Sequence, residues 1–229
     1  MPLLVIIVVM ILVGFIFGPS LWIKHVLKHY GNERADLPGT GAELARHLLD
    51  AAGLQAVKVE TTDLGDHYDP ESRTVRLLPQ HHDGRSVAAV AVAAHEVSHA
   101  VQHARGERAF QLRYDLVKNL TWIDRLATGI LLLAPVVFLI VKAPALLILQ
   151  IVAGILLLAI RVVVHIVTLP VEFDASFGKA LPALKRGGYL SKADLPAARR
   201  VLRAAAWTYV AAALATLLDV ARWFRILRF

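Results

Sequence analysis

The sequence predicts a mostly α-helical protein with a small β component, in which a polar region is joined to membrane-spanning helices. Three observations lead to this fold class. Hydrophobic residues make up 57% of the 229-residue chain and its mean hydropathy is +0.57, whereas soluble domains contain roughly 45–50% apolar residues. Long apolar runs occupy the start and the middle of the chain. The polar region between them shows helical spacing and short alternating stretches.

Charge and cysteine content exclude several classes of function. The 25 Lys and Arg residues outnumber the 18 Asp and Glu residues, which gives a net charge of +7. In a membrane protein such an excess is typical of loops that face anionic lipid headgroups. The chain has no basic helix with heptads and no Cys/His finger, so we expect no nucleic-acid partner. The absence of cysteine excludes disulfide bonds, thiol nucleophiles and cysteine-ligated zinc.

Residues 1–23 are predicted to form a transmembrane anchor. As a helix, the apolar run Leu3–Ile23 would span about 30 Å, the thickness of the hydrocarbon core. No basic residue precedes it and no small-x-small cleavage site follows it, which favours an uncleaved anchor over a signal peptide. Gly18, Pro19 and the interfacial Trp22 predict that the helix ends in this stretch.

Residues 24–122 are predicted to be the main aqueous region, since they contain 12 of the 25 basic residues. Thr40 and Glu43 have the spacing of a capping box, which predicts that a helix begins there. The predicted elements are a helix over 40–52, strands over 57–60 and 73–78, and a helix over 87–104. The strand over 73–78 either offers its edge to an extended substrate backbone or pairs within a sheet.

Residues 123–168 are predicted to form a transmembrane helical hairpin. The runs Leu126–Val141 and Pro144–Ile160 carry no charge, and only Lys142 and Ala143 separate them. A buried hairpin in a soluble core is the alternative. So long an apolar stretch exceeds what a core of this size can cover, which favours the membrane.

The last 61 residues divide into a polar part and an apolar part. Residues 169–196 are polar and are predicted to complete the functional site. Residues 197–229 are predicted to form an Ala/Leu-rich helix that associates with the membrane. Its uncharged middle, 204–218, is short for a span, and a crossing would place three arginines outside, against the positive-inside rule. A partly embedded helix is favoured, and a fourth span stays open.

The same rule predicts the orientation of the chain. Almost all basic residues lie in the two polar segments, which places residues 24–122 in the cytoplasm and Met1 and the hairpin tip outside. We therefore expect a multi-pass protein of the cytoplasmic membrane, in contact with the lipid bilayer.

The strongest functional signal is His95-Glu96-Val97-Ser98-His99, which lies inside the predicted helix over 87–104. Positions i and i+4 share one face of a helix, so His95 and His99 can bind the same Zn²⁺ ion. Glu96 then lies beside the metal and suits a general base that accepts a proton from water. The alternative is a helix with two surface histidines. The flanking Ala and Val residues predict a buried helix instead, where such a cluster without a metal would be costly.

A catalytic zinc site needs a third protein ligand. Glu172 is the first candidate, because two membrane crossings separate it from His99 and return the chain to the same side. Asp174 is the rival ligand, or it orients a ligand histidine. Both carboxylates could instead complement the dipole at a helix N-terminus. His103 lies one helical turn beyond His99 and is expected at the surface or beside a ligand.

These motifs resemble those of the YugP-type membrane zinc metallopeptidases, nearly end to end. The matching stretches are Thr40–Glu43, Asp66–Pro70, Asp83–Ser86, Ala93–His103, Leu169–Ser176 and Ala204–Leu214. The resemblance implies a membrane-bound, zinc-dependent protease with a zincin-like, gluzincin-type catalytic domain and one zinc ion per chain. The layout is also similar to the HtpX-type membrane proteases, which carry an aspartate four residues after the ligand glutamate. Here that position is Ser176, so Ser176 joins Asp174 and His103 as a candidate to orient the ligands.

The sequence therefore predicts a metalloendopeptidase in which His95, His99 and Glu172 bind zinc and Glu96 is the general base. The expected partner is a protein or peptide substrate, with membrane proteins among the candidates. One alternative is a site-2-like intramembrane protease, in which the helix over 87–104 itself spans the bilayer. It is disfavoured because no Leu-Asp-Gly ligand motif follows. The other alternative is a zinc-stabilised membrane adaptor that cuts nothing. It is disfavoured because a structural zinc site does not need a base at the position of Glu96.

Overall fold

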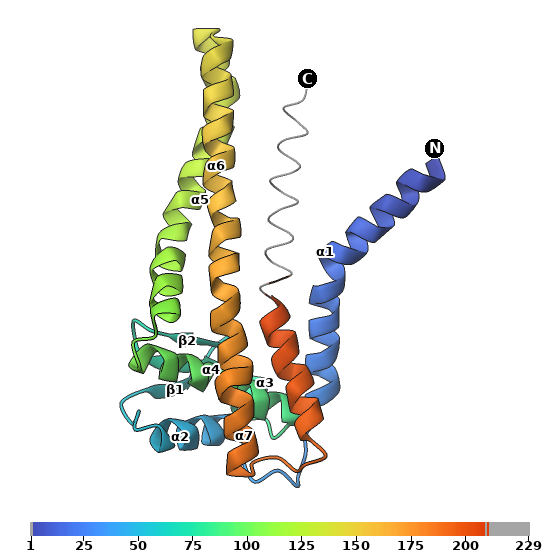
Figure 1. Ribbon diagram of the computed structural model, residues 1–229, viewed down its shortest axis with the longest axis vertical. Helices are drawn as coiled ribbons and strands as arrows, with labels where there is room; N and C mark the ends of the chain where they lie inside the picture. Colours follow the sequence, from blue (N-terminus) through green and yellow to red (C-terminus); the bar gives the residue numbers. More distant parts are fainter. Residues whose placement is uncertain (1, 209, 211–229) are drawn as a thin grey trace.

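The computed structural model describes residues 2–208 and 210, and it is mostly helical with one small sheet, as predicted (Figure 1). In chain order the elements are α1 (Pro2–Tyr30), α2 (Gly41–Ala51), β1 (Lys58–Thr61), β2 (His67–Asp69), β3 (Thr74–Leu77), α3 (Pro79–His82), α4 (Val87–Ala104), α5 (Arg108–Val141), α6 (Pro144–Phe173), the π-helix η1 (Asp174–Ala180) and α7 (Leu181–Gly187). Residues 195–208 form a further helix, which follows α7 without a label in Figure 1.

The sheet has the strand order β1-β3-β2. β3 pairs with β1 in parallel and with β2 antiparallel. The predicted strand over 73–78 is therefore the central strand, and its edges are not available to a ligand backbone. The exposed edge nearest the site belongs to β2, which the sequence analysis did not predict. A strand of three residues is too short to show a period of two.

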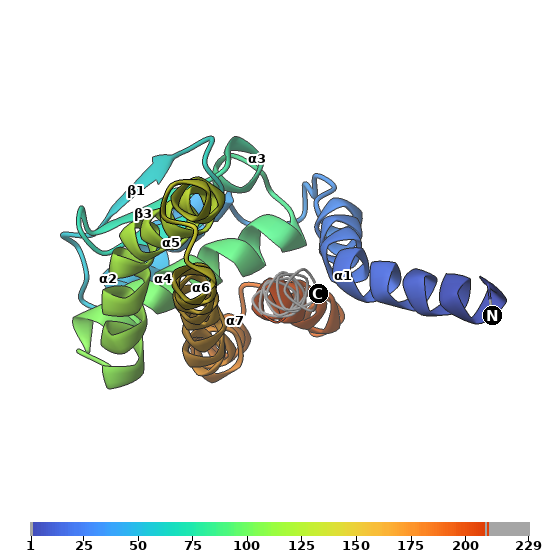
Figure 2. The ribbon, with the colours of Figure 1, turned by 90° about the horizontal axis from the view of Figure 1, so that it is seen from above.

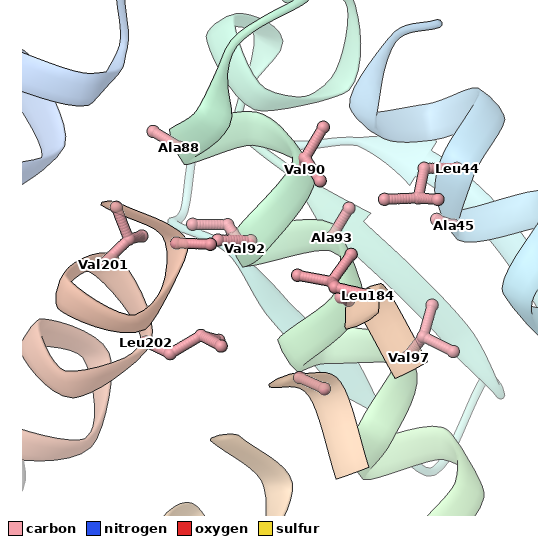
Figure 3. Close-up of a cluster of buried hydrophobic side chains, with 14 of the residues drawn as sticks. Leu44, Ala45, Ala88, Val90, Val92, Ala93, Val97, Leu184, Val201 and Leu202 are labelled. Carbon is pink, nitrogen blue, oxygen red and sulfur yellow. The ribbon is translucent and has the colours of Figure 1, made fainter. Parts of the chain in front are cut away.

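The helix α4 is the centre of the domain. It packs against α2, α3, η1, α7 and the strands β2 and β3, and all but three of its 18 residues are buried. Alanines along α4 let the neighbouring helices approach closely. Figure 3 shows the resulting core, in which Val90 of α4 points toward Leu44 of α2. In the same view Val92 points toward Leu202 of the last described helix, and Leu184 of α7 lies near Val97. The two helical turns that carry His95 and His99 are thus held rigidly from several sides.

Close packing also fixes the start of α2. Thr40 caps the helix and forms the predicted capping box with Glu43. Gly41 follows, with its N–H donating to the carbonyl of Gly84 at 3.2 Å. A methyl group at Gly41 would overlap the backbone carbonyl oxygen of His81, which cannot rotate away as a side chain could.

We expect Gly41→Ala to lower the free energy of unfolding by roughly 1–3 kcal/mol, because the added methyl group overpacks this contact. Thermal unfolding of the detergent-purified protein measures the effect as a lower Tm. Gly129→Ala is the matched control, since nothing lies within 4 Å of a Cβ at that helical glycine. An equal Tm for the two variants would contradict the close contact.

The helices α5 and α6 form an antiparallel hairpin that extends far beyond the domain (Figure 1). Both are long and apolar enough to span a membrane. Large apolar side chains near the tip are open to the surroundings, with Leu139 72% and Ile140 75% exposed. An uncovered apolar surface of this extent is typical of contact with lipid. The hairpin turns at Lys142, whose backbone is left-handed with φ 52°, as the predicted hairpin requires a turn there.

The N-terminal helix is longer than predicted. The prediction that it ends near Gly18–Trp22 is wrong, because α1 continues to Tyr30. Figure 1 shows α1 changing direction partway, and Figure 2 shows its first turns pointing away from the hairpin and the domain. A proline within a helix bends it, and in apolar surroundings a bend costs less than leaving backbone groups unpaired. The predicted membrane association of residues 197–229 falls largely outside the described residues.

Candidate metal centre

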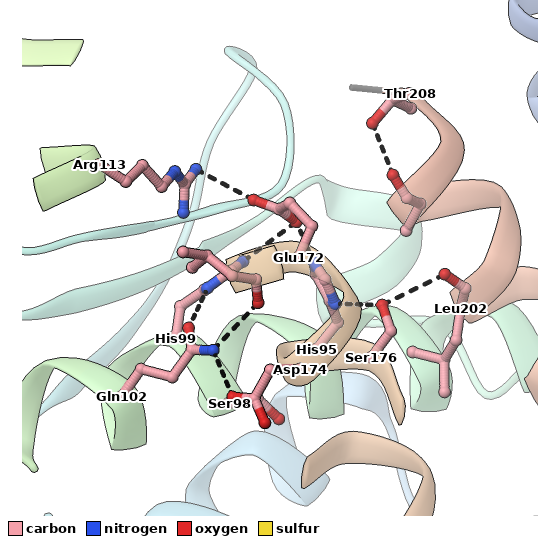
Figure 4. A network of polar contacts seen from close by, with 12 residues as sticks. His95, Ser98, His99, Gln102, Arg113, Glu172, Asp174, Ser176, Leu202 and Thr208 are labelled. Carbon is pink, nitrogen blue, oxygen red and sulfur yellow. Dashed lines mark hydrogen bonds and ion pairs between the residues drawn. The ribbon is translucent and has the colours of Figure 1, made fainter. Parts of the chain in front are cut away.

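Three side chains from two helices converge on one point (Figure 4). His95 and His99 lie one turn apart on α4, and Glu172 lies in the last turn of α6. Glu172 Oε2 is 3.1 Å from His95 Nε2 and 3.5 Å from His99 Nε2. All three residues are buried, and Glu172 is completely shielded from solvent. Within the part of the chain that the structure describes, these residues form the only group with metal-ligand geometry.

A serine fixes the proton of His95. The Ser176 hydroxyl lies 3.1 Å from His95 Nδ1 and donates its own hydrogen to the carbonyl of Leu202 at 3.2 Å. Since that hydrogen is already used, the Ser176 oxygen can only accept from His95. Nδ1 therefore carries the proton, and Nε2, which faces Glu172, is left with a lone pair. Ser176 thus orients the imidazole of His95, and the role of this ring as a metal ligand stays a prediction.

Gln102 fixes the position of the proton on His99 in the same way. The amide nitrogen of Gln102 donates to the carbonyl of Val171 at 3.0 Å and to Asp174 Oδ2 at 2.8 Å. Its oxygen, 2.9 Å from His99 Nδ1, can then only accept. His99 Nε2 is left with a lone pair as well. Gln102 is 1% exposed, so water does not compete for these hydrogen bonds.

The donor set fits a Zn²⁺ ion. Two neutral imidazole nitrogens and a carboxylate oxygen are ordinary zinc ligands, and tetrahedral bonds of about 2.0–2.1 Å place ligand atoms about 3.3 Å apart. The two spacings at Glu172 Oε2 agree with that value. Three lone pairs pointing at one buried spot repel one another unless a cation lies between them.

The pKa of His95 reflects the negative charge of the carboxylates around it. Burial alone would lower this pKa, but the hydrogen bond to Glu172 and the charges of Glu96 and Glu172 raise it above its ordinary value. His95 therefore takes up a proton more readily than an ordinary histidine, and protons compete with a metal ion at this site. Metal binding would displace that proton, so it is coupled to pH.

We expect Gln102→Leu to weaken zinc binding about 10- to 100-fold, since it removes the acceptor that orients His99. Gln102→Glu tests the tautomer argument, because it keeps the acceptor but loses both donated hydrogen bonds and faces Asp174. Competition titration with a zinc chelator measures the affinity. Gln55→Leu, at an exposed position in the turn after α2, is the control. Unchanged zinc affinity in Gln102→Leu would exclude the proposed role.

Glu96 lies next to the ligands and lines a cavity of about 290 Å³ together with His95 and His99. The walls are formed by the edge strand β2 with the loop after it and by α5. Their residues are Asp66, His67, Tyr68, Asp69, Pro70, Glu71, Phe110, Arg113, Tyr114, Val117 and Lys118. The cavity thus reaches two of the three converging side chains, His95 and His99, and the carboxylate of Glu96 along one strand edge.

Two basic side chains of α5 border this cavity. Arg113 lies 3.2 Å from Glu172 Oε1, the carboxylate oxygen on the far side from the histidines. It neutralises part of the ligand charge and favours binding of zinc through Oε2 alone. Farther out, Glu71 accepts hydrogen bonds from Tyr114 at 3.0 Å and from Lys118 at 2.9 Å. These contacts tie the loop after β2 to α5 across the cavity.

Asp174 and His103 are not among the converging side chains. Asp174 is bound by Lys179 and Gln102, so it acts on His99 through Gln102. The i,i+5 spacing of Asp174 and Lys179 matches the π-helix in which they lie. His103 instead hydrogen-bonds Tyr68 at 2.9 Å and stacks on Phe110.

Sequence reasoning missed Gln102, Arg113 and the edge strand β2. Gln102 had a usable signal, since it lies three residues after His99 on the same helix face. Arg113 had none, because it meets Glu172 only through the packing of α5 beside α6.

The fold and the site define a mostly helical domain that has two helices able to span a membrane and a His-His-Glu group that could hold a metal ion. The chain belongs to the family described as "Putative neutral zinc metallopeptidase", which matches residues 3–228. It is 38% identical over 216 residues to the "Putative membrane protease YugP" of Bacillus subtilis (strain 168), covering 93% of this chain and 92% of that protein. No solved structure matches the chain significantly. The zincin-like fold therefore stays a prediction.

Proposed function

We propose that this protein is a membrane-bound, zinc-dependent endopeptidase, with zinc held by His95, His99 and Glu172 and with Glu96 as the general base. One observation carries the proposal. The ligand atoms converge with their protons directed away, and a carboxylate that is not part of the ligand set lines the same cavity. A purely structural zinc site has no need of such a carboxylate.

Zinc bound there supplies a Lewis acid that polarises a carbonyl and acidifies water. The protein supplies the remaining groups. Glu96 accepts the proton of the attacking water and passes it to the leaving amine. The edge of β2 offers backbone groups to an extended substrate. His67 on β2 donates from Nδ1 to the carbonyl of Gly65 at 2.7 Å, so Nε2 is the nitrogen left for substrate.

The position of α4 favours a site at the membrane surface over an intramembrane protease. Helices, the π-helix and two strands surround α4, whereas a spanning helix would face lipid. The relative from Bacillus subtilis is described as a membrane protease, and two helices of this chain could cross a membrane. We place the site on the cytoplasmic side by the distribution of basic residues, with protein or peptide substrates, membrane proteins included.

Purified protein in mild detergent, incubated with an unfolded protein substrate, tests the proposal. We expect cleavage that stops when a chelator removes zinc and returns when zinc is added at one equivalent per chain. Single cysteines at Asp69 and Glu107 test the topology, and both should react with an impermeant thiol reagent from the cytoplasmic side. Zinc bound at one equivalent without cleavage of any substrate would favour the adaptor. Labelling of the two cysteines from opposite sides would favour the intramembrane protease.

A further inference from the structure

A second, smaller cavity borders the metal centre on the side away from α5. Its volume is about 180 Å³, and like the first cavity it is lined by Asp66, His95 and Glu96. Its remaining walls are Ile23 and Leu27 from the end of α1, Val92 of α4, and Ala205 and Thr208 of the last described helix. The two cavities therefore share His95 and the proposed base Glu96 as walls.

The far walls of this cavity are apolar. Ile23, Leu27, Val92 and Ala205 present only carbon atoms from their side chains. The Thr208 hydroxyl is used, since it donates to the carbonyl of Ala205 at 2.6 Å. The walls away from the metal thus hold no group that would select a charged side chain.

Asp66, in the polar wall nearest the proposed metal site, already has hydrogen-bond partners for both of its carboxylate oxygens. One oxygen of Asp66 accepts from the backbone N–H of Leu78 at 2.8 Å, and the other contacts His81 Nδ1 at 2.7 Å. These bonds fix the start of β2 and leave Asp66 as a structural residue. An apolar cavity of about 150 Å³ is large enough to bind benzene. A volume of 180 Å³ therefore suits a side chain between leucine and phenylalanine in size.

We propose that this cavity is a substrate pocket that receives an aliphatic or aromatic side chain next to the bond being cut, with Ala205 and Leu27 setting the size of the side chain that fits. The inference rests on the proposed function. A backbone lying along β2 past Glu96 has the apolar cavity beside it, because His95 and Glu96 line both spaces. The membrane anchor α1 then has a direct part in substrate recognition.

The helix that carries Ala205 also supports the metal centre. The Leu202 carbonyl, one turn before Ala205, accepts the hydrogen bond that fixes Ser176 and thereby His95. Ala205 is partly exposed to the cavity, whereas its neighbours Ala204 and Ala206 are buried in the core. A larger residue at 205 therefore fills the cavity without replacing a core contact.

Peptide hydroxamates test the pocket without turnover, because they bind zinc and carry a chosen side chain beside it. Zinc-loaded Glu96→Gln protein, which cannot hydrolyse the probe, is titrated calorimetrically with hydroxamates carrying Gly, Leu or Phe. We expect the Leu and Phe probes to bind roughly 10- to 100-fold more tightly than the Gly probe, the gain that burial of such a side chain gives. Equal affinities for the three probes, or no binding to zinc-loaded protein, would overturn the pocket.

Two substitutions then change the size preference in opposite directions. Ala205→Leu should remove the advantage of Leu and Phe over Gly, and Leu27→Ala should favour Phe over Leu. Ala193→Leu, an equal change at an exposed position before the same helix, is the control and should leave the preferences as they are. Zinc content of one per chain in each variant shows that the site is intact. An unchanged preference in both variants would overturn the assignment.

The outcomes separate this inference from the proposed function. If the hydroxamate preference shifts as expected but the protein cleaves no substrate, the pocket is supported and the protease activity is contradicted. If the protein cleaves a substrate at sites with no apolar preference, and Ala205→Leu does not change those sites, the protease activity is supported and the pocket is contradicted.

Discussion

Glu96→Gln is expected to lower the rate of peptide hydrolysis by about 10²- to 10⁴-fold, the range that a general base contributes. The amide has nearly the same shape as the carboxylate but cannot accept a proton at neutral pH. Zinc content should stay at one per chain, because the ligands His95, His99 and Glu172 are retained. The measurement is kcat with an unfolded protein substrate, beside zinc analysis of the same sample.

A matched substitution separates the role of this carboxylate from a general effect of charge. Glu60→Gln removes an equal charge at an exposed position on β1, at the far edge of the sheet, and should keep full activity. Full activity in Glu96→Gln with zinc bound would exclude Glu96 as the base. Loss of zinc together with activity would show that Glu96 supports the ligands instead.

Glu172→Gln is expected to weaken zinc binding by more than 100-fold, beyond the effect of altering groups that only orient a ligand. The substitution removes the charged ligand and leaves Arg113, 3.2 Å from Oε1, facing a neutral amide. Glu172 then no longer offsets the charge of Arg113, which repels Zn²⁺ from the buried site. Chelator competition measures the affinity, and circular dichroism checks that the helices persist.

Asp174→Asn decides between the two carboxylates of this segment. Asp174 contacts Gln102 and Lys179 but neither histidine, so its substitution should weaken zinc binding only about 10- to 100-fold. A larger loss in Asp174→Asn than in Glu172→Gln would make Asp174 the ligand and contradict the observed geometry.

The geometry around the metal was partly readable from the sequence. The spacing of His95 and His99 predicts their shared face because helix periodicity is fixed. Two predicted membrane crossings place Glu172 on the same side as the histidines, and the structure brings it to them. The role of Gln102 was not readable, since it depends on where the Val171 carbonyl and Asp174 lie across the helix interface. Packing between α4 and α6 determines those positions, and no local pattern encodes it.

In the fold, too, features set by nearby residues were predicted and features set by distant contacts were not. The capping box at Thr40 was predicted because it depends on residues three apart. The end of α1 was predicted wrongly, because Gly18 and Pro19 favour a helix end in water, where freed backbone groups bond to solvent. The strand β2 was missed because its three residues are held by Asp66 and by pairing with β3, both nonlocal contacts.

The helix α6 runs without interruption from the hairpin turn to Glu172, so its length sets the distance between the apolar run and the proposed metal site. Twelve residues separate Ile160, the end of the uncharged run, from Glu172, and at 1.5 Å per residue they measure about 18 Å. An extended chain covers that distance in about five or six residues. With α6 spanning the bilayer, a protein anchored in the same membrane would reach the zinc ligands with a tether of that length. A folded domain resting directly on the lipid surface could not do so without first unfolding its membrane-proximal end.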